Sequence, residues 1–138
     1  MRVRVQDASR SRRTPASARF AKWVRAAAAG QTEVTVRLVA TAEAHRLNLA
    51  YRGKDYATNV LTFAYEPGLG DIVLCPAVIG REALVQGKAL ESHYAHLTIH
   101  AVLHMRGYDH AGSRDAARME RAEIRILKGL GHPNPYAG

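Results

Sequence analysis

The sequence predicts a single α+β domain, residues 1–138, in which a mixed sheet of about four strands packs against helices. Short strand-like segments recur four times and longer helix-like segments five times. The helix-like segments fall both between the strands and after them, which favours α+β. The apolar fraction of 47% allows a buried core. The single cysteine, Cys75, excludes an intramolecular disulfide and a four-cysteine zinc site.

Two strands and a helix are predicted in the N-terminal third of the chain. Residues 2–6 alternate basic or polar side chains with valine, which is typical of a strand with one apolar face. Thr14 and Pro15 are typical of a helix start, with threonine as the cap and proline in the first turn. That helix is expected to end at Gly30. Residues 32–39 are rich in β-branched side chains and are predicted as the second strand.

The middle of the chain is predicted to form a helix followed by a β-hairpin. Thr41 is a candidate cap for a helix that reaches a turn at residues 52–55. Residues 60–65 and 71–74 have strand character. The connection between them, residues 66–70, contains proline and glycine, so the two strands are expected to pair as neighbours.

Three helices are predicted to complete the chain. Pro76 is typical of a first helical residue and opens a helix over residues 76–86. A long helix over residues 89–106 is expected to end at Gly107. Ser113 is a candidate cap for a last helix, which stops near residues 129–131.

The formal net charge of +8 comes almost entirely from the N-terminal end of the chain. Residues 1–30 contain eight basic residues and one acidic residue, whereas residues 31–138 contain 12 basic and 11 acidic residues. Such a segment attracts polyanions, most often nucleic acid, or is a solvated arm that is partly disordered. No secretory signal is found, and no apolar run approaches the roughly 18 residues of a membrane span, so a cytoplasmic protein is expected.

Four of the seven histidines lie between residues 93 and 104, and the pattern predicts a metal site. His100 and His104 are four residues apart on a predicted helix, so their rings project from one face. Gly107 allows the chain to turn back, which lets His110 approach the same point. Three imidazoles leave a fourth tetrahedral position open, as in catalytic zinc sites. The prediction is one Zn²⁺ per chain, held by the long helix and the following loop through His100, His104 and His110; the alternative is a set of hydrogen-bonded core histidines.

Two residues near these histidines, His96 and Asp109, have two interpretations each. His96 either orients a metal ligand through a hydrogen bond or is a core histidine. His93 is expected to be exposed. Asp109 either hydrogen-bonds a ligand or caps the following helix, and Tyr108 is expected to pack under the turn.

The spacing His-x-x-x-His-x-x-Gly-x-x-His is also that of the metzincin proteases. In those enzymes, glutamate follows the first histidine and acts as the general base. Ala101 stands at that position here, which argues against proteolysis. Aspartate and glutamate residues are scattered without paired spacing, which disfavours a two-metal nuclease.

The segment from His100 to His110 resembles the signature of the YbeY family of bacterial endoribonucleases, also called rRNA maturation factors, with Ala101 where glycine is usual. Residues 47–63, 70–72 and 130–136 resemble further segments of that family. The resemblance implies an α+β fold with the zinc site in a cleft. It also implies metal-dependent cleavage of RNA, linked to maturation of the 3′ end of the small-subunit rRNA and to ribosome quality control.

The resemblance also implies roles for individual residues. His100, His104 and His110 would bind zinc, and Arg52 would be the catalytic arginine that contacts the RNA backbone or a developing negative charge. A guanidinium group suits phosphate oxygens chemically, although a surface arginine in a turn is the alternative. Thr58 and Asn59 either line the cleft or stabilise the entry to a strand.

The sequence therefore predicts a cytoplasmic, zinc-dependent endoribonuclease for single-stranded RNA, a hydrolase of phosphodiester bonds. The expected partners are RNA, in particular rRNA, and the small ribosomal subunit with its proteins; no membrane partner is expected. Two alternatives from other classes stay open. One is a ribosome-assembly factor that binds RNA and holds a non-catalytic zinc ion, and the other is a zinc hydrolase of small amides or esters.

Overall fold

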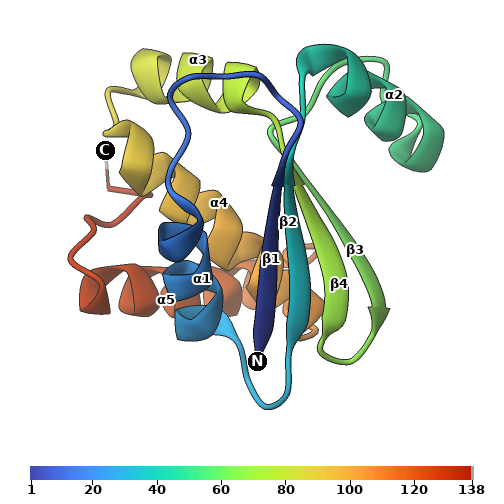
Figure 1. Cartoon of the computed structure of the whole chain (residues 1–138). Coiled ribbons are helices and arrows are strands. Elements are labelled where there is room, and N and C mark those ends of the chain that lie inside the picture. The colour runs from blue at the N-terminus through green and yellow to red at the C-terminus, as the bar shows by residue number, and fades with distance from the viewer. Residues whose placement is uncertain (138) are drawn as a thin grey trace.

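Four strands form one mixed sheet in the computed structural model, which describes residues 1–137 (Figure 1). The strands lie in the spatial order β1-β2-β4-β3. β1, β2 and β4 are parallel neighbours, and β3 runs antiparallel to β4. Their bounds are β1 Arg2–Asp7, β2 Glu33–Leu38, β3 Val60–Glu66 and β4 Leu69–Leu74. The predicted mixed sheet of about four strands is confirmed.

Five helices accompany the sheet within the described residues. Their bounds are α1 Ser17–Ala27, α2 Thr41–Arg52, α3 Pro76–Gln86, α4 Leu90–Met105 and α5 Ser113–Gly129. α1 and α5 both pack on α4, which also contacts β3 and β4, whereas α2 lies away from these three helices (Figure 1). The predicted order of elements along the chain is confirmed. Within residues 1–137, no helix combines the length and the apolar character needed to cross a membrane.

The larger hydrophobic core lies between the sheet and helices α1, α4 and α5. β2 contributes alternate residues, Val34, Val36 and Leu38, because successive strand side chains point to opposite faces. α1 contributes Phe20 and Trp23, whose rings meet edge to face at 5.3 Å between centroids. Each fully buried side chain of this size stabilises the fold by roughly 1.5–3 kcal/mol, so this core holds α4 firmly against the sheet.

A smaller core forms around α2 and α3. Val73 of β4 and Leu61 of β3 pack there with Ala44 of α2 and Val78 of α3. The two neighbours of Val73 on β4, Ile72 and Leu74, belong to the larger core, so the two clusters use opposite faces of β4. The smaller core fixes α2 relative to β3 and thereby positions the residues at the end of α2.

Gly70 of β4 permits a close approach between the sheet and the end of α4. A Cβ atom at this position would lie 2.6 Å from the carbonyl oxygen of Phe63 and 2.7 Å from Cε of Met105. Neither separation is compatible with a side chain unless the neighbour moves. Because Met105 is the last residue of α4, the absence of a side chain at Gly70 brings the end of this helix against the sheet.

Three predicted helix caps are wrong. The cap positions of α1, α2 and α5 are occupied by Ala16, Ala40 and Gly112, and none of the three helices has a side-chain cap hydrogen bond. Thr14 precedes α1, whereas Thr41 and Ser113 are the first helical residues rather than caps. The residue with the best local capping side chain therefore does not decide where these helices begin.

Candidate active site

Three histidine rings gather at the end of α4. His100 and His104 lie one turn apart with ring centroids 6.1 Å from each other. His110, in the loop after α4, lies 5.6 Å from His100 and 5.5 Å from His104. Gly107 has a φ of 95°, a left-handed conformation that lets the chain reverse after the helix. The structure thus brings together the three residues that the spacing predicts as neighbours.

These rings line a cleft with a volume of about 740 Å³. The same cleft is lined by the end of α2, the following loop and β3, which include Arg52, Tyr56 and Phe63. Thr58 and Asn59 also line the cleft. Two segments that are separated by about 40 residues of sequence therefore line one cavity.

Arg52 is the last residue of α2 and is exposed. Gly53 follows with a φ of 68° and closes the helix through its backbone N–H, which donates to the carbonyl oxygens of Asn48 and Leu49. Within residues 1–137, the Arg52 guanidinium forms no salt bridge. Its charge and its five donors are therefore free to meet an anionic group in the cleft.

Two exposed tyrosines flank Arg52. Tyr51 and Tyr56 have relative exposures of 68% and 56%, and both line the cleft. The Tyr51 ring meets Phe63 edge to face at 5.1 Å between centroids, so one face of the phenol is supported by the sheet. Flat aromatic surfaces beside an unpaired guanidinium are the groups that bind unpaired nucleotides.

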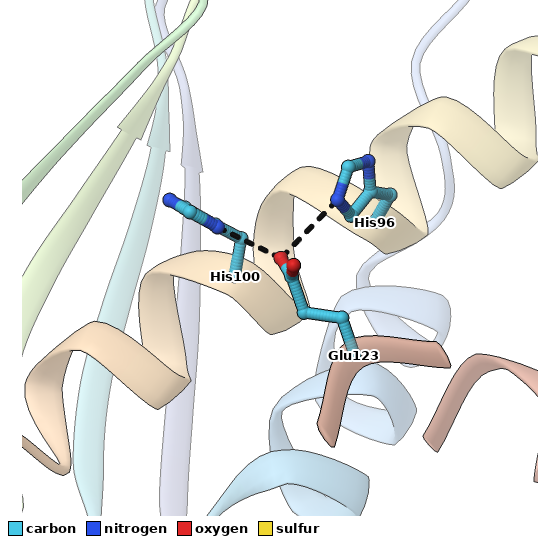
Figure 2. Close-up of side chains that lie close together, drawn as sticks. All are labelled: His96, His100 and Glu123. Carbon is cyan, nitrogen blue, oxygen red and sulfur yellow. Dashed lines mark hydrogen bonds and ion pairs between the residues drawn. The ribbon is translucent and has the colours of Figure 1, made fainter. Parts of the chain in front are cut away.

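A buried carboxylate lies on the other side of His100. Glu123 of α5 is fully buried, and its Oε2 atom lies 2.7 Å from Nδ1 of His100 and 3.2 Å from Nε2 of His96 (Figure 2). The hydroxyl of Tyr136 donates a hydrogen bond to the other carboxylate oxygen. Four side chains from α4, α5 and the C-terminal segment thus form one polar network.

The electrostatics of this network follow from its donors. Burial alone would raise the pKa of Glu123, but hydrogen bonds from His100, His96 and Tyr136 outweigh it and lower the pKa well below its usual value. The pKa of Tyr136 is raised, because burial disfavours its phenolate and because it donates to Glu123. Glu123 is therefore ionised and Tyr136 is protonated at neutral pH.

His96, His100 and Glu123 are also positioned as a possible metal site. One ligand atom from each lies within 4.8 Å of the others. This group uses Nδ1 of His100, as the 2.7 Å contact shows, whereas the Nε2 atom of the same ring is not engaged by Glu123. His100 therefore belongs to two clusters at once, the carboxylate network and the three-histidine group.

His93 lies in a third cluster of polar side chains. The prediction that His93 is exposed is wrong. Its side chain is only 5% exposed, and its Nε2 atom lies 2.9 Å from Glu82 of α3. Glu82 also accepts a hydrogen bond from Asn59 at 3.0 Å. α3 covers this turn of α4, so His93 is buried by a neighbouring helix that its own periodicity could not indicate. Through Glu82, the cluster ties the cleft residue Asn59 to α3 and α4.

Residues near His110 stabilise the loop. The Asp109 carboxylate accepts hydrogen bonds from the backbone N–H groups of His110 and Ala111 at 2.7 and 3.2 Å. Tyr108 packs beneath the Arg118 guanidinium, 4.7 Å from the ring centroid. Asp109 thus caps the turn that carries His110, and no hydrogen bond from its side chain to a histidine ring is found within the described residues.

The first strand of the basic N-terminal segment, β1, lies away from this cleft. β1 is one edge strand of the sheet and β3, which lines the cleft, is the other edge strand (Figure 1). Arg2 and Arg4 are exposed on β1. None of the basic residues among residues 1–30 lines the cleft.

Sequence reasoning missed Glu123 and gave Tyr136 no role in the site. A signal for Glu123 exists: it lies four residues after Met119 and four before Leu127, both of which are buried. A carboxylate on the apolar face of an amphipathic helix needs partners in the core. The partners themselves, on α4 and 13 residues further along the chain, are not visible from that pattern.

Comparisons with known proteins give a consistent result. The family model described as Endoribonuclease YbeY matches residues 5–131. A protein named Endoribonuclease YbeY from Aromatoleum aromaticum is 53% identical over 137 residues, which cover 97% of this chain and 89% of that protein. One of the same name from Thiobacillus denitrificans is 50% identical and is covered to 96%. A Thermotoga maritima protein solved in solution matches with a TM-score of 0.58 at 22% identity over 97% of this chain and 99% of that one, which supports the fold.

Proposed function

The chain belongs to the YbeY endoribonuclease family, and from this premise we propose that it is a zinc-dependent endoribonuclease that cleaves single-stranded RNA. We further propose that its substrate is rRNA and that it acts in maturation of the small-subunit rRNA 3′ end and in ribosome quality control, as the family resemblance implies. The whole of residues 1–138 would form this one catalytic domain. The observation that supports the proposal most directly is the cleft that three imidazoles and Arg52 line together.

The donor set fits a zinc ion. Three histidine rings with centroids 5.5–6.1 Å apart offer neutral nitrogen ligands, which zinc accepts in catalytic sites. His100, His104 and His110 would hold one ion per chain. Bound there, zinc supplies Lewis acidity and a +2 charge that is not neutralised by its ligands. An anionic phosphodiester suits such a site better than a neutral amide.

Arg52 would bind the scissile phosphate within the same cleft. Its guanidinium has no salt bridge within residues 1–137, and it shares the cleft with the histidines. Charge that develops on the phosphate oxygens during cleavage would be offset by its two parallel N–H groups. Arg52 would therefore act on the transition state as well as on binding.

The tyrosines support a preference for single strands. Bases in a duplex are stacked on one another, whereas unpaired bases can stack on aromatic side chains. Tyr51 and Tyr56 present exposed rings at the mouth of the cleft, on either side of Arg52 in sequence. An unpaired RNA segment could place its phosphate near Arg52 and its bases on these rings.

Metal content and RNA cleavage test the proposal together. We expect about one zinc ion per wild-type chain and loss of both zinc and cleavage in His104→Ala. Arg52→Ala should retain zinc and lose roughly 100-fold or more in cleavage rate, as for removal of one transition-state donor. His45→Ala and Arg46→Ala are matched controls, since neither residue lines the cleft. Full cleavage by His104→Ala would refute the zinc mechanism.

Two other results would favour the alternatives. Intact RNA after incubation with zinc-loaded wild type, combined with firm binding to small ribosomal subunits, would favour an assembly factor with a non-catalytic zinc ion. Hydrolysis of small esters or amides that survives Arg52→Ala would favour a hydrolase of small substrates.

A further inference from the structure

Glu123 contacts His100, the histidine that belongs to both the carboxylate network and the three-histidine group. His100 lines the cleft of about 740 Å³ together with His104 and His110, and it also lines a second cavity of about 370 Å³ together with Glu123 and Tyr136. Its ring therefore stands between the two spaces. One ring nitrogen, Nδ1, lies 2.7 Å from the Glu123 carboxylate on the second side (Figure 2).

This contact determines the state of the His100 ring. An ionised carboxylate only accepts hydrogen bonds, so the His100 nitrogen that faces it must carry a proton. In a neutral imidazole the other nitrogen, Nε2, then carries the free lone pair. A metal ligand needs that lone pair, and the hydrogen bond at Nδ1 fixes both the tautomer and the orientation of the ring.

We propose that Glu123 is a positioning residue that holds His100 with Nε2 available to a metal ion in the three-histidine cleft. This inference rests on the proposed zinc site. Glu123 itself would not bind the ion. Its Oε2 atom lies at hydrogen-bond distance from both His100 and His96, and its Oε1 atom accepts from Tyr136, so three donors already use most of the lone pairs of the carboxylate.

His96 and Tyr136 act through Glu123. His96 lies one turn before His100 on α4, and its Nε2 atom is 3.2 Å from both the Glu123 carboxylate and the Tyr136 hydroxyl. The side-chain exposures of His96 and Glu123 are 13% and 0%. These donors keep the buried carboxylate ionised and immobile, because an unpaired charge there would be costly.

The test is a zinc titration against a competing chelator with wild type, Glu123→Gln and Glu120→Gln. Glutamine has nearly the same shape, but it has one acceptor oxygen for three donors, and its amide group donates. We expect Glu123→Gln to lower zinc affinity by about 10- to 100-fold. Glu120→Gln is the matched control, since Glu120 lies on the same helix, lines the same cavity and makes no side-chain hydrogen bond within residues 1–137.

A second variant separates positioning from general stability. Tyr136→Phe removes one donor to Glu123 and leaves the contact with His100 intact. We expect it to lower the melting temperature while changing zinc affinity by less than about threefold. If Tyr136→Phe and Glu123→Gln weakened zinc binding equally, or if Glu123→Gln bound zinc like wild type, the positioning role would be refuted.

The histidine tautomer supplies a readout without metal. In ¹⁵N NMR spectra of the metal-free protein, we expect His100 to carry its proton on Nδ1 in wild type and to lose this preference in Glu123→Gln. A wild-type His100 protonated on Nε2 alone would overturn the inference. Should wild-type protein bind no zinc, the metal part of the proposed function would fail, while the tautomer would still decide the role of Glu123.

Single alanine substitutions distinguish Glu123 as a positioning residue from Glu123 as a ligand. If the ion were bound by His96, His100 and Glu123, His96→Ala would abolish zinc binding and His110→Ala would leave it intact. We expect the opposite result, in which His110→Ala loses more zinc affinity than His96→Ala.

Discussion

Replacing Gly70 by alanine should destabilise the protein, although it adds only one methyl group. The new Cβ would lie 2.6 Å from the Phe63 carbonyl oxygen, whereas ordinary contacts begin at about 3.4 Å. The gap must therefore widen by about 0.8 Å. The Met105 side chain, at 2.7 Å, can rotate away, but the Phe63 oxygen belongs to the backbone of the paired strand β3.

The size of the effect follows from the cost of overpacking. Adding atoms to a packed site costs roughly 1–3 kcal/mol of folding free energy. For a chain of this length, each kcal/mol lowers the melting temperature by roughly 4 °C. Gly70→Ala should therefore melt roughly 4–12 °C below wild type. Because Met105 directly follows His104, we also expect weaker zinc binding from a displaced end of α4.

Thermal and urea unfolding measure this effect, and Gly80→Ala provides a control of opposite sign. Gly80 lies within α3, and no atom lies within 4 Å of a Cβ added there. Alanine at that position should stabilise the helix by roughly 0.5–1 kcal/mol. If Gly70→Ala melted at or above the wild-type temperature, the close approach of α4 to the sheet would not have the energetic role that we infer.

Three further predictions concern His93, Tyr51 and Tyr65. Burial lowers the pKa of His93 from 6.5 despite the nearby Glu82, so the unfolded chain binds a proton first as the pH falls. The free energy of unfolding should therefore decrease from pH 6.5 downwards to the folded-state pKa, and this decrease should be shallower in urea unfolding of His93→Gln than in wild type. An equal decrease in the two proteins would speak against this assignment. Tyr51→Ala should weaken binding of a single-stranded RNA oligonucleotide by roughly 5- to 150-fold, because stacking contributes about 1–3 kcal/mol per base, whereas Tyr51→Phe should bind normally in the same fluorescence titration. Unchanged binding by the alanine variant would remove Tyr51 from the RNA site. Tyr65→Phe should lower the free energy of unfolding, measured in urea, by less than about 1 kcal/mol, because the hydrogen bond from Tyr65 to Asp71 is exposed. A decrease of several kcal/mol would contradict this expectation.

The fold could be predicted from the sequence because its signals are local. The alternation in β1, the β-branched side chains of β2, and the proline and glycine between β3 and β4 define these elements within a few residues. The helix starts were less predictable, since Thr14 is a better cap than Ala16 and yet α1 begins after Ala16. Packing of Phe20 and Trp23 in the larger core outweighs the preference for a capping side chain.

The candidate site was predictable only where its residues are close in sequence. His100, His104 and His110 share one helix and one turn, so their spacing alone indicated that they meet. Glu123 contacts His100 from a different helix, and the burial of His93 depends on α3. Such contacts depend on how helices pack against one another, which single-sequence periodicity does not specify.

The position of β1 at the edge of the sheet has a consequence for the behaviour of the protein at high concentration. An edge strand presents unpaired backbone N–H and C=O groups that can recruit a strand from another molecule. Arg2 and Arg4 project from this edge and are exposed, while Val3 and Val5 between them face the core. Two such edges brought together would align like charges, so these arginines oppose intermolecular strand pairing. The basic residues that are expected to attract polyanions would thus also oppose aggregation of the folded chains.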